Sequence, residues 1–253
     1  MTSVPLTYLA YQVPAFALKL GRPRWFDGTA LALGSMAPDW AYVLVGSRFA
    51  VDAHAPAGLL LLAVPAAAVA AVVTRRLAPA VADCLPEPLG LPLRRLRAIG
   101  ARRPPLVLTG VSALFGALTH VGWDSFTHAG RWGARTVPWL RDSHEILGAT
   151  FTGAKLAQRG STVLGLVLGL VLLGLVLRTL PDVQSTGTAP RAAVGRFWAA
   201  VGVGGLVGVL WGLGAGSFVA GAVIRVSLGV AAGVVIGALL VRSATPAEAP
   251  TAR

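Results

Sequence analysis

Three side chains of the types that bind metal ions recur at four-residue spacing in one stretch of the chain. The stretch Gly116–His128 contains His120, Asp124 and His128. On an α-helix these positions fall within an arc of about 80° and lie one turn apart. Imidazole and carboxylate groups on neighbouring turns are about 6 Å apart and can bind one metal ion. The spacing indicates either a metal site or an internal hydrogen-bond relay.

Two more polar residues stand in apolar surroundings earlier in the chain. Asp39 follows Pro38, which has no backbone N–H and can leave carbonyl groups free beside it. His54 stands two residues before an apolar segment. Either residue alone could be an ordinary polar contact, and Asp39 could pair with an arginine such as Arg48. Because an ionisable group at the bilayer centre costs about 2.5–3.5 kcal/mol on insertion scales, we treat them as functional candidates.

Together these residues predict a divalent metal site. The set contains imidazole and carboxylate without thiolate, which suits zinc, and also manganese or iron. The predicted metal ligands are Asp39, His54, His120, Asp124 and His128. Asp39 or Asp124 could instead act as a catalytic base. His144 or Glu145 could complete a second metal position or be solvated loop residues.

The composition places these residues in a membrane protein. Of 253 residues, 55% are hydrophobic and 13% are charged, and the mean hydropathy is +0.71. A soluble domain carries about 25% charged residues, so about half of the usual charge is missing. A single cysteine excludes a disulfide framework and a Cys-rich zinc module. We assign the net charge of +12 to membrane orientation, and not to nucleic-acid binding, because the basic residues are dispersed between apolar segments.

Several apolar stretches are long enough, or nearly so, to cross a bilayer core of about 30 Å as helices. They are Gly28–Gly46, Pro56–Val73, Pro105–Trp123, Thr162–Leu177, Phe197–Gly216 and Phe218–Val241. The shorter stretch Val4–Leu18 lacks a signal-peptide cleavage site and predicts an interfacial or re-entrant helix. We therefore expect an all-α fold, a polytopic integral membrane helical bundle of about six transmembrane helices plus this short N-terminal helix.

The basic residues predict the orientation of the spans. With a cytoplasmic N-terminus, Lys and Arg concentrate in the inner segments, most densely between residues 75 and 103, as the positive-inside rule requires. The predicted location is the inner or plasma membrane, with both termini cytoplasmic and the metal ligands near the outer face. Residues 1–160 are predicted to carry the site, residues 161–243 to form Gly-rich packing helices, and residues 244–253 to be a disordered tail.

Two motifs resemble the signatures of a bacterial membrane-protein family known as domain of unknown function 4184. They are Gly34-Ser-Met-Ala-Pro-Asp39-Trp-Ala-Tyr42 and the stretch Gly116–His128, extended by His54-Ala-Pro-Ala-Gly58-Leu59 and Gln158-Arg-Gly-Ser161-Thr162. The order Pro-Asp, His and His-x-x-x-Asp is also distantly similar to that of inner-membrane metal-dependent hydrolases and zinc phospholipase C. This resemblance implies metal-assisted attack of water on a phosphoester. Those families tend to have an early His where Tyr11 stands, which implies fewer metal ions or an altered activity here.

The function expected from these features is a membrane-embedded metal-dependent hydrolase, acting on a phosphoester or lipid-type substrate at the outer face. Its expected partners are the lipid bilayer and that small-molecule substrate, without nucleic acid. The residues predicted to hold the substrate are Arg131, Arg135, Gln158 and Ser161. The alternative is a non-enzymatic membrane protein, either an ion or proton carrier or a scaffold. A carrier is less expected, because its polar residues should occur on several spans and in inverted repeats.

Overall fold

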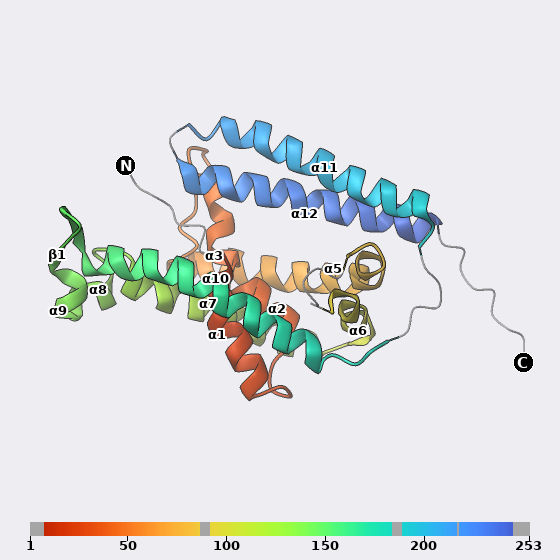
Figure 1. Cartoon of the computed structure of the whole chain (residues 1–253), viewed down its shortest axis with the longest axis horizontal. Coiled ribbons are helices and arrows are strands. Elements are labelled where there is room, and N and C mark those ends of the chain that lie inside the picture. The colour runs from red at the N-terminus through yellow and green to blue at the C-terminus, as the bar shows by residue number, and fades with distance from the viewer. Residues whose placement is uncertain (1–7, 87–91, 184–188, 217, 245–253) are drawn as a thin grey trace, which may run out of the picture. The chain divides into compact units, whose positions relative to one another are not determined.

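The computed structural model describes residues 8–86, 92–183, 189–216 and 218–244, and this part of the chain is nearly all helical (Figure 1). The chain forms two compact units. Unit 1 comprises Met1–Val72 and Arg103–Val176, and unit 2 comprises Val73–Arg102 and Leu177–Arg253. Residues 1–7 and the predicted tail from residue 245 onward lie outside the described residues. The predicted division at residue 160 falls inside a helix and stays a prediction about where function resides.

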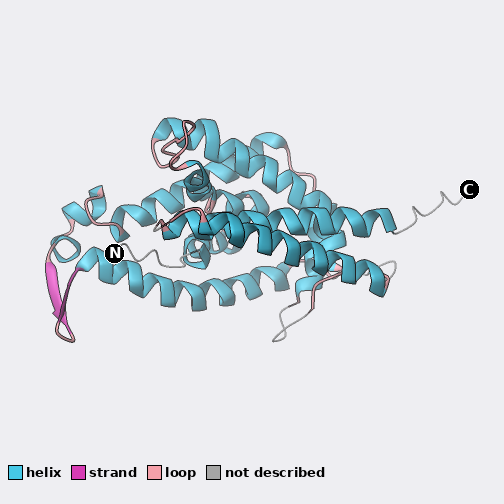
Figure 2. Cartoon of the chain, turned by 90° about the horizontal axis from the view of Figure 1, so that it is seen from above, coloured by secondary structure: helices cyan, strands magenta, loops and turns pink. Residues whose placement is uncertain are grey.

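Unit 1 contains most of the short elements. Its helices are α1 (Tyr8–Gly21), α2 (Gly28–Gly34), α3 (Ala37–Trp40), η1 (Ala41–Leu44), α4 (Pro56–Gly58), η2 (Leu59–Ala63), α7 (Leu106–Thr127), α8 (Trp132–Thr136), α9 (Pro138–Arg141) and most of α10 (Gly153–Thr179). Figure 2 shows its two strands, β1 (Ser143–Ile146) and β2 (Ala149–Thr152), as an antiparallel hairpin. Helix α5 (Val64–Ala82) passes into unit 2, which also holds η4 (Leu93–Leu96), α6 (Arg97–Ala101), α11 (Arg191–Leu213) and α12 (Val219–Ala244).

Five helices in the described part of the chain are long and apolar enough to cross a membrane. They cover Pro56–Ala82, Leu106–Thr136, Gly153–Thr179, Arg191–Leu213 and Val219–Ala244. Each contains one of the predicted spans or most of it. The predicted N-terminal helix is α1, whose 14 residues are too few to cross a bilayer at 1.5 Å per residue.

The remaining predicted span, Gly28–Gly46, is not a continuous helix, so a count of about six spans is not confirmed. The stretch is divided into α2, α3 and η1. Pro38 has no N–H to donate, and the N–H of Asp39 donates to the carbonyl of Met36 at 3.3 Å instead of continuing the α-helical pattern. Hydropathy alone predicted one helix here, because it does not register this loss of backbone hydrogen bonds.

The broken segment packs closely along α7. A Cβ added at Gly34 would lie 2.2 Å from the carbonyl oxygen of Ala113, and one added at Gly116 would lie 2.2 Å from that of Leu31. Small residues at these positions therefore let the two backbones touch. The two helices run parallel, because the start of α2 lies near the first turns of α7 and the end of α2 lies further along α7.

Hydrogen bonds place the start of α2 near the start of α7. The backbone N–H of Asp27, the N-cap of α2, donates to Ser112 Oγ at 2.9 Å, and Thr109 Oγ1 donates to Asp27 Oδ2 at 3.0 Å. At the other end, the carbonyl of Ser35 lies 2.8 Å from His120 Nδ1. Helix α2 with its caps, Asp27–Ser35, thus follows α7 from its first turns to His120.

In unit 2, glycines hold α11 against α12. A Cβ added at Gly204 would lie 2.3 Å from the carbonyl oxygen of Gly229, and one at Gly233 would lie 2.5 Å from that of Ala200. The prediction that the four-residue glycine spacing marks packing faces is confirmed for these helices.

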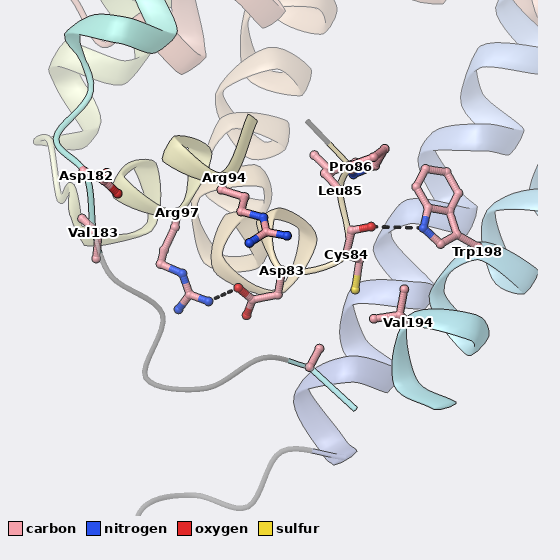
Figure 3. Close-up of a pocket in the computed structure, with 11 residues that line it drawn as sticks. Asp83, Cys84, Leu85, Pro86, Arg94, Arg97, Asp182, Val183, Val194 and Trp198 are labelled. Carbon is pink, nitrogen blue, oxygen red and sulfur yellow. Dashed lines mark hydrogen bonds and ion pairs between the residues drawn. The ribbon is translucent and has the colours of Figure 1, made fainter. Parts of the chain in front are cut away.

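Unit 2 also contains a cavity of about 630 Å³, shown in Figure 3. Asp83 forms an ion pair with Arg97 at its wall, and the indole N–H of Trp198 donates to the carbonyl of Cys84 at 3.1 Å. Two arginines, Arg94 and Arg97, line the cavity together with two aspartates, so its charges balance.

Candidate metal centre

Four of the predicted metal ligands meet in the interior of unit 1. His120 and Asp124 lie one turn apart on α7, Asp39 lies on α3, and His54 stands just before α4. His120 is completely buried, and the side chains of His54 and Asp124 are nearly so. Helix α7 provides two of the four groups, while the broken segment and the loop before α4 deliver the others across its surface.

The ring nitrogens face the carboxylates at uniform distances. His54 Nε2 lies 3.4 Å from Asp39 Oδ1 and 3.5 Å from Asp124 Oδ2. His120 Nε2 lies 3.5 Å from Asp39 Oδ1 and 3.6 Å from Asp124 Oδ2. These separations are long for N–H···O hydrogen bonds, which cluster near 2.9 Å. They match the spacing of about 3.4 Å that ligand atoms take around a tetrahedral ion with bonds of about 2.1 Å.

Both Nε2 atoms are buried without a hydrogen-bond partner. Asp39, His54 and His120 also form a group whose ligand atoms all lie within 4.8 Å of one another, which is close enough for one metal ion. Buried polar atoms are seldom left unpaired, so two orphaned imidazole nitrogens at one point indicate a group that binds between them. The donor set and spacing therefore fit a divalent cation.

The tautomer of His120 strengthens this conclusion. A carbonyl oxygen only accepts hydrogen bonds, so the Nδ1 of His120 must donate to Ser35. In its neutral form His120 then directs the lone pair of Nε2 toward two carboxylate oxygens. Such an arrangement is repulsive unless a proton or a metal ion lies between the groups. The Ser35 carbonyl is available because the helix breaks before Asp39.

The pKa of His54 also indicates that this point of the structure favours a positive charge. Burial of its imidazole disfavours the charged form, but the carboxylates of Asp124 and Asp39 outweigh this effect and raise the pKa of His54 above its ordinary value. The two acids thus retain a cation at this point, whether it is a proton or a metal ion.

A second layer of contacts orients Asp124. The hydroxyl of Tyr11 donates to Asp124 Oδ1 at 2.7 Å, and the Tyr11 ring stacks on His120 with centroids 3.9 Å apart. Tyr11 therefore contacts two of the four groups. Motif spacing missed this role, and that of Ser35, because both contacts join residues far apart in the sequence. The one hint in the sequence was that Tyr11 stands where the resembling hydrolase families tend to have a histidine.

His128, also predicted as a ligand, lies beside the group of four and not within it. Its Nδ1 is 3.3 Å from Asp124 Oδ1, and its Nε2 is 2.9 Å from Gln158 Nε2. The amide nitrogen of Gln158 only donates, so the Nε2 of His128 accepts and its Nδ1 carries the hydrogen. That Nδ1 lies 3.3 Å from both Thr127 Oγ1 and Asp124 Oδ1, so His128 links Gln158 to the edge of the cluster.

In the described part of the chain, none of the other predicted site residues forms a hydrogen bond or ion pair with the four cluster residues. The side chains of Arg131 and Arg135 are exposed at α8, and Ser161 Oγ donates to the carbonyl of Gln158 within α10. His144 lies on β1, where its Nε2 donates to the carbonyl of Trp139 at 2.8 Å. Roles for Arg131, Arg135, Gln158 and Ser161 in substrate binding stay predictions.

These features define a nearly all-helical protein with five candidate membrane spans and a buried His/Asp cluster fit for one cation. Residues 5–243 match the model of the family described as Domain of unknown function (DUF4184). The chain therefore belongs to this family, as its motifs predicted. No curated protein and no solved structure matches it. The predicted similarity to metal-dependent hydrolases stays an expectation.

Proposed function

We propose that this protein is a membrane-embedded metal-dependent hydrolase acting on a phosphoester of lipid type. The observation that supports the proposal most is the pair of buried, unpartnered Nε2 atoms of His54 and His120, each 3.4–3.6 Å from two carboxylate oxygens. Ligands of this kind bind zinc, manganese or iron. Such an ion supplies Lewis acidity and makes water acidic enough to act as a nucleophile near neutral pH.

The four residues of the cluster have different roles in this proposal. His54 and His120 would hold the cation through neutral Nε2 atoms, while the hydrogen bond from Tyr11 fixes Asp124 through its other oxygen, which also lies 3.3 Å from His128 Nδ1. The Asp39 side chain is the most exposed of the four, at 17%. It is therefore the best placed to meet a substrate and to take a proton from an attacking water.

The position along α7 supports a substrate at the outer face. A basic stretch, with Lys19 in the last turn of α1 and Arg22 and Arg24 just after it, leads to Asp27, which is hydrogen-bonded to the first turns of α7. The start of α7 also follows Arg103. Basic residues favour the cytoplasmic side, so the cluster near the other end of α7 faces outward, in an inner or plasma membrane.

A lipid headgroup is the substrate class that such a site meets. Arg131 and Arg135 lie just beyond α7, and their exposed guanidinium groups can bind the phosphate of a headgroup at the membrane surface. A non-enzymatic ion or proton carrier would use the same buried groups but would turn over no substrate. Phosphoester turnover therefore separates the two functions.

The test measures hydrolysis of mixed phospholipid vesicles by purified protein, before and after chelation and after addition of zinc or manganese. Asp39→Asn keeps the size of the side chain but removes its charge, and it should lower turnover by at least about 100-fold, the lower range of a lost general base. Asp142→Asn, at an exposed aspartate paired with Arg141, is the matched control. Metal-loaded, folded protein without any phosphoester turnover would refute the hydrolase.

A further inference from the structure

The tip of the β1–β2 hairpin carries an unusual residue. Leu147 follows Ile146, which pairs with Ala149 across the hairpin, and Leu147 and Gly148 form the turn. Leu147 has a φ of 52° and Gly148 a φ of 75°. Among the described residues, Leu147 is the one non-glycine residue with positive φ, and its exposed fraction is 102%.

Neither property helps the hairpin to fold in water. A two-residue turn with both residues at positive φ favours Asn-Gly or Asp-Gly, because a side chain with a Cβ is strained in this region. A leucine here adds strain and also leaves a large apolar side chain without any contact. Backbone strain of this kind persists where it serves a purpose other than folding.

Apolar and aromatic side chains are also exposed on the hairpin and its neighbours. Ile146, next to the tip, is 43% exposed, and Trp139, whose ring lies 4.9 Å from that of His144 on β1, is 53% exposed. Tryptophan is enriched where proteins cross the boundary between lipid and water. A basic residue lies at the hairpin base, where Arg159 in the second turn of α10 lies over the ring of Phe151 at 4.5 Å. An apolar tip, an indole and a cation together match the headgroup region of a bilayer.

The direction of the hairpin agrees with that location. Figures 1 and 2 both show β1 and β2 running across the axis of α10, at the end where that helix begins. Because α10 is a candidate span, a hairpin across its axis lies along the membrane plane. Exposed apolar side chains such as Val163 and Leu164 begin further along α10, after the polar stretch that contains Lys155, Gln158 and Arg159.

The hairpin is also joined firmly to the helices behind it. The N–H of Gly153 donates to the carbonyl of Asp142 at 3.0 Å, and a Cβ at Gly153 would lie 2.0 Å from the carbonyl oxygen of Trp139. His144 donates to the same Trp139 carbonyl. The strands, α9 and the start of α10 therefore move as one piece.

We infer that the β1–β2 hairpin is an interfacial membrane anchor, which inserts Leu147 at the boundary between headgroups and acyl chains of the bilayer that the spans cross. The occupant of this apolar tip is lipid, because the hairpin leads directly into α10, a candidate span, and an indole (Trp139) and a guanidinium group (Arg159) contact the hairpin at its base. The anchor is independent of the metal centre and of any hydrolase activity.

Site-directed spin labelling tests this inference, because Cys84 is the single cysteine of the chain. In a Cys84→Ala background, a nitroxide is attached at Leu147→Cys, at Ser143→Cys in the hairpin base, and at Leu168→Cys within α10. The protein is reconstituted in phospholipid nanodiscs with one chain each. Collision rates with oxygen, which enters lipid, and with a water-soluble nickel chelate are compared.

We expect the oxygen-to-nickel collision ratio at position 147 to exceed that at position 143 several-fold and to approach that at position 168. A ratio at 147 equal to that of a water-exposed label would overturn the inference. A label at 147 that is shielded from both reagents would also overturn it, because the tip would then contact protein.

A second pair of variants shows that the leucine itself makes the lipid contact. Asn suits the left-handed backbone, so Leu147→Asn keeps the turn and removes the apolar tip. The oxygen-to-nickel collision ratio of a label at Ile146→Cys should fall several-fold when Leu147→Asn is added. An unchanged ratio at 146 would contradict an anchor that depends on Leu147.

Discussion

The two oxygens of Asp124 have different surroundings, and this difference explains how one carboxylate can be held toward a cation. Oδ1 accepts from the Tyr11 hydroxyl at 2.7 Å and lies 3.3 Å from His128 Nδ1. Oδ2 faces the Nε2 atoms of His54 and His120. The hydrogen bond from Tyr11 to one oxygen fixes the orientation of the other, as second-layer contacts do in known metal sites. Tyr11 is therefore a positioning residue.

Removal of the Tyr11 hydroxyl should weaken metal binding without unfolding the protein. Tyr11→Phe keeps the ring that stacks on His120 but leaves Asp124 Oδ1 without its closest donor. We expect the dissociation constant for zinc to rise about 10- to 100-fold, the usual effect of losing such a contact. Calorimetric titration of chelated and reloaded protein measures it. An unchanged dissociation constant would show that Asp124 needs no such support.

Cys84 offers a pH-dependent readout outside the spans. Burial raises the pKa of its thiol, and the charge of Asp83 raises it further. The thiolate is the reactive form, so a raised pKa leaves less of it at neutral pH. Maleimide should therefore modify native Cys84 more slowly than a free thiol at pH 7, with the rate still rising above pH 9. The same rate in native and detergent-denatured protein would contradict this prediction.

The break between α2 and α3 is the element that assembles the cluster. Pro38 was predicted to interrupt the helix and free carbonyl groups beside Asp39. The N–H of Asp39, which in an α-helix would donate to Ser35, donates to Met36 instead, and the carbonyl of Ser35 contacts His120. The prediction that this stretch is a membrane span is not confirmed, because α2, α3 and η1 divide it and mean hydropathy does not register hydrogen-bond continuity.

Glycine packing sets the distance between α11 and α12, and two positions in α11 form a matched pair to test it. A Cβ at Gly204 would lie 2.3 Å from the Gly229 carbonyl oxygen, whereas one at Gly202 meets nothing within 4 Å. Gly204→Val should destabilise the fold by about 1–3 kcal/mol, the usual cost of overpacking, and Gly202→Val much less. Thermal unfolding in one detergent compares them. Equal losses would show that helix propensity and not packing governs this contact.

Over the molecule as a whole, the sequence predicts spans and depth better than contacts. Apolar length marked the five candidate spans, and the ends of two of them placed His54, His120 and Asp124 near one level. The depth of Asp39 was predicted from the stretch Gly28–Gly46, which is not confirmed as a span. Residues at one level can still point away from each other, so their meeting required the packing of α2 and α7. His128 has the right spacing and yet turns to Gln158, because the helix ends at Thr127.

The metal content of the purified protein tests the cluster most directly. Protein extracted in mild detergent is analysed by mass spectrometry for zinc, manganese and iron, alongside His120→Ala, Asp124→Ala and the control His144→Ala, whose imidazole lies outside the cluster on β1. We predict about one ion per chain in the native protein and the control, and its loss in the two cluster variants while all four remain folded. Folded native protein without any metal, before and after incubation with zinc, would contradict a metal centre formed by these residues.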